Sequence, residues 1–109
     1  MRDQQFWNWM KTVGKEDHTP MVLAPMRDAM SRCQRVENGF GVDLDEEFNR
    51  DKGKSVIDRL NYSREDEQMN VAAPKGLYFK PGANLYNGLA SLKNAAKKYF
   101  RFCAERSNP

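Results

Sequence analysis

Basic side chains at helical spacing are the residues of this 109-residue chain whose types and positions best suit a chemical task, the binding of phosphate. Lys93, Lys97 and Arg101 recur every four residues, so an α-helix would carry them on one face. Lysine and arginine on such a face neutralise the phosphates of nucleic acids. The candidate binding residues on this stretch are Tyr86, Lys93, Asn94, Lys97, Lys98 and Arg101.

A second basic set lies earlier in the chain, where Arg27, Arg32 and Arg35 point away from an apolar helical stripe. If the two sets face the same way, they form a clamp for an anionic partner. The overall net charge is +3, but residues 75–109 carry seven basic side chains and only one acidic one. This distribution favours phosphate or an acidic protein surface as the partner. The alternative is that these cations form an ordinary solvated surface.

Aromatic residues give a different set of candidates, for contacts with a protein. Trp7 and Trp9 are two residues apart, so both cannot point inward from one helix. One of them is therefore expected to be partly exposed. Tyr78 and Phe79, in an irregular stretch, complete the candidate protein contacts.

The sequence predicts no enzyme, because the residues that catalysis or metal binding would need are missing. His18 is the one histidine, and Cys33 and Cys103 are the two cysteines, so a zinc site and a histidine-based nucleophile both lack ligands or partners. The two glycine-rich motifs that bind phosphate, G-x-x-x-x-G-K-[ST] and G-x-G-x-x-G, are both absent. We therefore expect no metal, no cofactor and no small-molecule substrate. The two cysteines are expected to be buried free thiols.

The elements that would position these residues are helices. Five stretches have helical apolar spacing or helix-capping signals, at residues 3–13, 24–38, 43–51, 55–61 and 84–105. Asp3 and Asp43 are the predicted N-caps, and Asn38-Gly39 is the predicted end of the second helix. Residues 62–82 form a long irregular connection with room for a short strand or hairpin. The prediction is one compact all-α domain over residues 1–109, a bundle of about five helices.

The chain is expected to be cytoplasmic. No apolar run approaches the ~20 residues that cross a bilayer. The first residues lack the basic, apolar and small-residue order of a signal peptide.

Three segments resemble a known family. They are residues 31–37 (SRCQRVE), 41–46 (GVDLDE) and 91–102 (SLKNAAKKYFRF). Together they resemble the core-binding, or SAM-like, helical domain that precedes the catalytic domain in tyrosine recombinases and some restriction-type proteins. The resemblance implies a module that grips duplex DNA from one side while another domain does the chemistry. It implies that four cations lie near DNA, namely Arg32, Arg35, Lys93 and Lys97.

Two functions follow as hypotheses. The first is a non-catalytic module that binds duplex DNA, or RNA, through the basic faces of the second and last helices. The second is a small phage or mobile-element protein that binds and inhibits a host or defence complex. Such a protein would contact an acidic or nucleic-acid-binding protein surface.

Overall fold

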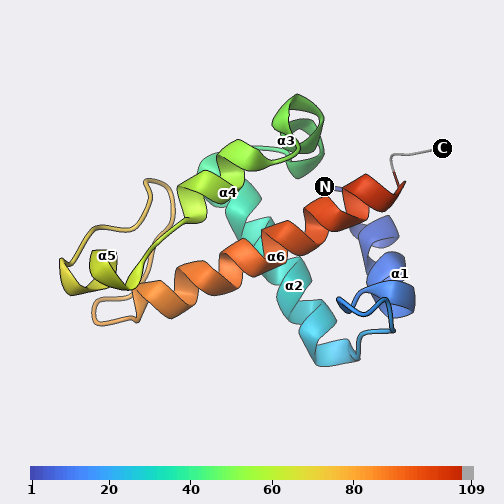
Figure 1. Cartoon of the computed structure of the whole chain (residues 1–109), viewed down its shortest axis with the longest axis horizontal. Coiled ribbons are helices and arrows are strands. Elements are labelled where there is room, and N and C mark those ends of the chain that lie inside the picture. Colours follow the sequence, from blue (N-terminus) through green and yellow to red (C-terminus); the bar gives the residue numbers. More distant parts are fainter. Residues whose placement is uncertain (107–109) are drawn as a thin grey trace.

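The computed structural model describes residues 1–106, and within them the chain is all-α, as predicted. Figure 1 shows the helices and their order along the chain. No strand occurs among these residues. In addition to the predicted bundle of about five helices, the structure has one further short helix. The helices are α1 (Asp3–Val13), α2 (Leu23–Phe40), α3 (Leu44–Asp51), α4 (Lys54–Leu60), α5 (Arg64–Gln68) and α6 (Leu85–Arg106).

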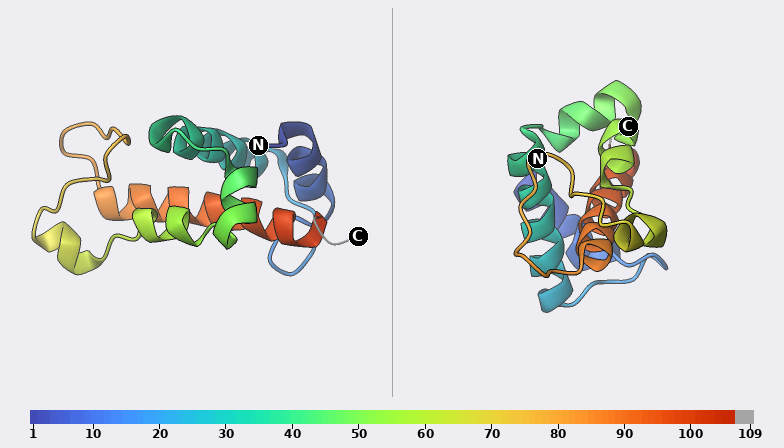
Figure 2. Two further views of the ribbon diagram at one scale, coloured as in Figure 1. Left: turned by 90° about the horizontal axis from the view of Figure 1, so that it is seen from above. Right: turned by 90° about the vertical axis from the view of Figure 1, so that its left-hand side faces the viewer.

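Helix α6 is the central element of the fold. At 1.5 Å per residue it extends about 33 Å, which is most of the 44 Å longest dimension of the molecule. In Figure 1 it crosses over α2, and both views in Figure 2 place the two helices in adjacent layers. Helices α1, α3 and α4 pack against the same helix. Its apolar face supplies the buried residues Leu89, Leu92, Ala95, Ala96, Tyr99, Phe100, Phe102 and Cys103.

An aromatic cluster joins α1 to α6. The rings of Phe6 and Tyr99 meet edge to face with centroids 4.9 Å apart, and Trp9 meets Phe102 in the same way at 5.8 Å. All four side chains are almost completely buried. Such pairs add stability beyond the apolar area that they remove from water. The cluster therefore fixes the position of α1 against the C-terminal half of α6.

A polar cluster next to these rings ties α3 to both helices. The Tyr99 hydroxyl donates to Asp45 Oδ1 at 2.6 Å and accepts the backbone N–H of Arg2 at 2.9 Å. The Arg2 guanidinium pairs with the same carboxylate at 3.0 Å. Burial would raise the pKa of Asp45, but the hydrogen bonds from Tyr99 and Arg2 outweigh it, so this pKa lies below its ordinary value.

The helix ends follow local sequence signals in part. Asp43 caps α3 as predicted, because its carboxylate accepts the backbone N–H groups of Asp45 and Glu46. The prediction for Asp3 was wrong: it lies inside the first turn of α1, and the cap residue Arg2 makes no side-chain cap bond. Helix α2 also passes the predicted stop and ends at Phe40, followed by the C-cap Gly41 in the left-handed conformation with φ of 65°.

The connection between α4 and α6 holds a helix where the sequence left room for a strand or hairpin. Helix α5 begins with a capping box, in which Ser63 and Asp66 each accept the other's backbone N–H. The chain then returns to α2 through Gly76, with φ of +99°. A Cβ atom at Gly76 would lie only 2.0 Å from the Gly39 carbonyl oxygen, so glycine permits this approach. Leu77 is buried at the same contact.

Candidate nucleic-acid interface

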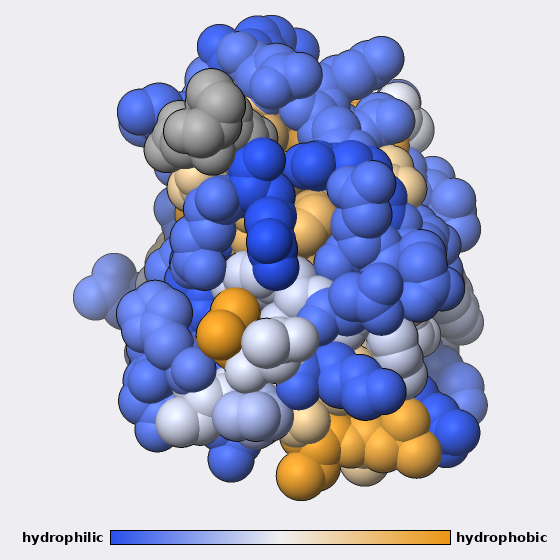
Figure 3. Space-filling model, turned by 90° about the vertical axis from the view of Figure 1, so that its right-hand side faces the viewer, coloured by the Kyte–Doolittle hydropathy of each residue, from blue (hydrophilic) through white to orange (hydrophobic). Residues whose placement is uncertain are grey.

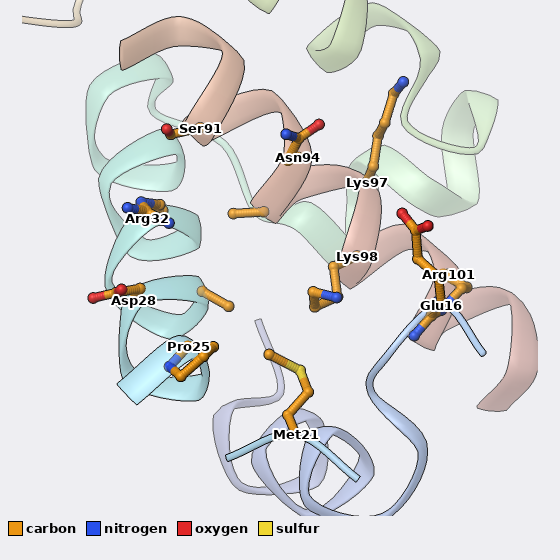
Figure 4. A pocket seen from close by; sticks show the side chains of 12 residues that line it. Glu16, Met21, Pro25, Asp28, Arg32, Ser91, Asn94, Lys97, Lys98 and Arg101 are labelled. Atoms are coloured by element: carbon orange, nitrogen blue, oxygen red, sulfur yellow. The ribbon is translucent and has the colours of Figure 1, made fainter. Parts of the chain in front are cut away.

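A groove runs between α2 and α6, with the α1–α2 connection at one end (Figure 4). Its volume is about 690 Å³. Five of the nine residues that the sequence offers for nucleic-acid binding line it, one from α2 and four from α6. They are Arg32, Asn94, Lys97, Lys98 and Arg101.

Small residues let the two helices approach where they cross. Ala29 of α2 and Ala95 of α6 both line the groove and both are buried. Beside them the Cys33 thiol donates to the Ala95 carbonyl oxygen at 3.3 Å. Burial raises the pKa of Cys33 far above its ordinary range, which keeps the thiol protonated as a donor. Both cysteines are buried and free, as predicted.

The two walls of the groove each carry an exposed cation. Arg32 lies on the α2 side of the groove and Lys97 on the α6 side. In Figure 4 the Lys97 side chain extends from α6 away from the space between the two helices, at the rim of the groove. Neither side chain takes part in a hydrogen bond or ion pair among residues 1–106. Asn94, between them on α6, is likewise exposed and makes no such contact in this part of the chain. These three groups are available to an external anion.

Arg101 has a different role, because its guanidinium is bound to the end of α1. Its Nη2 donates to the carbonyl oxygens of Gly14 at 2.5 Å, Lys15 at 3.1 Å and Val13 at 3.4 Å. The last carbonyls of a helix have no intrahelical partner, so a cation there is favourable. The guanidinium also lies 4.7 Å from the centre of the Trp9 ring. Arg101 therefore holds the α1–α2 connection in place at the end of the groove.

Lys98 supports the same connection. Its ammonium donates to the Gly14 carbonyl oxygen at 2.9 Å. Burial lowers the pKa of Lys98, and the neighbouring charge of Arg101 lowers it further. Among the predicted cations of α6, Lys97 is thus the one that both lines the groove and remains free of contacts within residues 1–106.

One helical turn beyond the groove, the connection before α6 packs against both α2 and α6. The Phe79 ring lies 4.5 Å from the Arg35 guanidinium of α2. The same ring also packs against Gly88 of α6, where a Cβ would come within 2.6 Å of the ring. Arg35 also donates to the Tyr78 carbonyl oxygen. Arg35 thus anchors this loop, although the sequence suggested it for contact with nucleic acid.

The remaining predicted residues lie outside the groove. Arg27 is exposed on α2, and Lys93 is half-buried on α6. Tyr86 is covered by the Arg64 guanidinium, which lies 4.5 Å from its ring centre. The predicted clamp therefore contains fewer residues than the sequence suggested. Its cations without a hydrogen bond or ion pair in the described chain are Arg32 and Lys97.

The aromatic candidates for protein contact divide in the same way. Trp9 is 1% exposed, so its selection as a contact residue was wrong; its indole N–H donates to Glu105 at 3.1 Å. Trp7 is the partly exposed member of the pair, as the spacing required. Phe79 is partly covered by Arg35, whereas Tyr78 is 73% exposed.

Two acidic groove residues escaped the sequence interpretation. Asp28 lies one turn before Arg32 on α2, and Glu16 comes from the α1–α2 connection. The spacing between Asp28 and Arg32 was a usable signal, because residues four apart share a helix face. Nothing local in the sequence could have brought Glu16 to α6. The groove therefore combines four cations with two carboxylates.

Within residues 1–106, no group of three or more histidine, cysteine, aspartate or glutamate side chains is arranged to hold a metal ion. No helix in this part of the chain has both the length and the apolar character needed to cross a membrane.

Comparison of the chain with protein-family models found no match, and comparisons with curated proteins and with solved structures found none either. The resemblance of three segments to core-binding domains therefore remains a prediction, based on the residues that carry it.

Proposed function

We propose that this chain is a non-catalytic nucleic-acid-binding module whose groove between α2 and α6 receives the sugar–phosphate backbone of duplex DNA. One observation carries the proposal. Arg32 and Lys97 line the groove from opposite helices, and both are exposed and without hydrogen-bond or ion-pair partners in the described part of the chain.

The physical argument is that these two cations are free to bind phosphate at little internal cost. A lysine or arginine already held in an ion pair must break that pair before it contacts a phosphate, whereas Arg32 and Lys97 exchange only water. Asn94 adds an amide that donates to a phosphate or a base edge. Arg101 and Lys98 contribute positive potential from their fixed positions beside Gly14.

The carboxylates of Asp28 and Glu16 set the expected strength of binding. Each repels phosphate and offsets part of the attraction of the cations. We therefore expect moderate affinity that is strongly dependent on salt, as for a module that contributes one part of a larger interface. The proposed setting is the cytoplasm, with duplex DNA as the first partner to test and RNA as the second.

The test is a fluorescence anisotropy titration of the chain against labelled duplex DNA at several salt concentrations. The variant Arg32→Gln/Lys97→Gln removes both free groove cations. The matched control Lys11→Gln/Lys52→Gln removes the same net charge from two exposed positions outside the groove. Each phosphate contact that is lost should reduce the slope of log affinity against log salt by about 0.9.

We expect the groove variant to reduce both affinity and slope, and the control to bind nearly as the parent does. Equal losses in both variants would indicate a response to net charge alone and would contradict the proposal. Absence of binding by the parent chain at low salt would contradict it as well.

A second candidate function, contact with a protein, is favoured by one specific surface. Val22 is 64% exposed and Leu23 is 51% exposed where α2 begins. Figure 3 shows hydrophobic atoms gathered at the lower edge of an otherwise mainly hydrophilic face, in the region of this helix start. Neighbouring exposed apolar side chains are typical of protein contacts. The variant Leu23→Ser should leave DNA binding intact, which separates the two functions.

A further inference from the structure

The loop one helical turn beyond the groove, before α6, carries an exposed aromatic ring on a fixed backbone. Tyr78 is 73% exposed, although its neighbour Leu77 is 7% exposed and packs against Gly39 of α2. Arg35 binds the Tyr78 carbonyl oxygen and stacks on the ring of Phe79. These contacts fix the backbone on either side of Tyr78. The Tyr78 side chain itself makes no hydrogen bond and no ring contact within residues 1–106.

The surface beside this ring supplies hydrogen-bonding groups. The Tyr78 loop and the outer face of α2 together line a shallow hollow of about 870 Å³. Ser31 and Asn38 line it from the helix, and both are exposed and without partners in the described chain. An exposed ring next to an amide and a hydroxyl matches what a nucleobase needs, a stacking partner for its face and hydrogen bonds for its edge.

Charge on the same loop points to a nucleic acid rather than to an uncharged aromatic ligand. Lys75 and Lys80 flank Tyr78 three residues before and two residues after it. Both ammonium groups are exposed and unpaired within residues 1–106. Lysines on either side of an aromatic ring hold the backbone phosphates while the ring stacks on the base.

The position of the loop connects this hollow to the groove. Phe79 lies between Arg35 of α2 and Gly88 of α6. Arg35 is three residues beyond the groove residue Arg32, about 4.5 Å along the helix axis. Gly88 precedes the groove residue Ser91 by the same interval. A strand that leaves the groove at this end therefore runs toward the loop that carries Tyr78, on the neighbouring face of α2.

We infer that Tyr78 and the adjacent face of α2 form a site for an unpaired nucleobase, on the strand whose backbone occupies the groove. This inference rests on the proposed nucleic-acid function. It predicts a ligand preference. The chain binds a duplex with a single-stranded extension, whose first unpaired base stacks on Tyr78, more tightly than it binds a blunt duplex.

The test compares three labelled DNA duplexes, one blunt, one with a short thymine overhang and one with an overhang of equal length made of abasic nucleotides. The two overhangs carry the same phosphates, so a difference between them reports the bases alone. The variants are Tyr78→Ser, which removes the ring, and Tyr78→Trp, which keeps one. Met69→Ser is the matched control, because Met69 is 78% exposed on the same connection.

We expect the parent chain to prefer the thymine overhang to the abasic one by at least about fivefold, the low end for one base stacked on an aromatic ring. Tyr78→Ser should abolish this preference and leave affinity for the blunt duplex unchanged, while Tyr78→Trp and Met69→Ser should retain it. Binding to the blunt duplex without any base preference in the parent, or with a preference that survives Tyr78→Ser, would overturn the inference and leave the proposed function standing. Failure to bind any of the three duplexes would overturn both.

Discussion

Replacement of Arg101 by methionine should destabilise the fold while leaving the free groove cations in place. Methionine keeps most of the aliphatic stem of Arg101 and removes the guanidinium. The change eliminates the hydrogen bonds to the carbonyl oxygens of Gly14 and Lys15, at 2.5 and 3.1 Å, and the contact with the Trp9 ring. The substitution therefore tests how strongly α6 holds the α1–α2 connection.

The magnitude follows from these contacts. A hydrogen bond to a charged group contributes about 1.5–3 kcal/mol, and a cation–π contact about 0.5–1 kcal/mol. Two facts reduce the sum: the Arg101 Nε is buried without a hydrogen bond, and Gly14 keeps the bond from Lys98. We expect a net loss of about 2 kcal/mol, which for a domain of this size lowers Tm by roughly 8–12 °C.

The assay is thermal unfolding followed by circular dichroism, with Lys97→Met as the matched control on the same helix. Lys97 is exposed and makes no hydrogen bond or ion pair within residues 1–106, so its replacement should change stability by less than about 0.5 kcal/mol. Equal melting temperatures for the two variants would refute the reasoning. In that case the bonds from Arg101 would contribute no net stability, and the connection would be held by apolar packing alone.

Three further predictions concern the frame and the charge of the groove. The hydrogen bonds from Tyr99 and Arg2 hold the pKa of Asp45 below its ordinary value of 3.8, against the effect of burial. The ionised carboxylate therefore contributes its full stabilisation above pH 3.8, and this stabilisation is lost as the pH falls through the lower folded-state pKa. In urea unfolding, Asp45→Asn should be less stable than the parent at pH 7, and the difference should narrow at pH 3. Gly76→Ala should cost at least about 2 kcal/mol in the same assay, because a Cβ would lie 2.0 Å from a carbonyl oxygen at a positive φ; an unchanged unfolding midpoint would contradict the close contact. Asp28→Asn should raise affinity for duplex DNA by roughly two- to fivefold at low salt, since it removes a repulsive charge from the groove; unchanged anisotropy titrations would show that phosphate does not approach α2 there.

Local signals in the sequence were sufficient for most of the helices. The apolar spacing of residues 3–13 gave the bounds of α1, and the carboxylate of Asp43 gave the start of α3. These features depend only on neighbouring residues. The end of α2 was misplaced because Gly39 looked like a helix stop. Its lack of a side chain instead admits Gly76 and Leu77, which lie far away in the sequence.

The candidate site shows the same division between local and tertiary information. Helical spacing brought Lys97, Asn94 and Arg101 to one side of α6, and the structure places all three along the groove. Spacing could not reveal that the Arg101 guanidinium would bind carbonyl oxygens at the end of α1. Nor could it reveal that the Arg35 guanidinium would bind the Tyr78 carbonyl oxygen. Those partners become neighbours only when the helices pack. The cations left available are a subset that sequence periodicity cannot select.

The most direct test of the groove as a nucleic-acid site is an NMR titration of the ¹⁵N-labelled chain with a short blunt DNA duplex. We predict that amide shifts concentrate on α2 around residues 25–32 and on α6 around residues 91–98, and that they weaken as salt is raised. Shifts confined to other surfaces, such as the exposed start of α2 at Val22 and the half-exposed Trp7, would contradict the account. The absence of any shift at low salt would contradict it too.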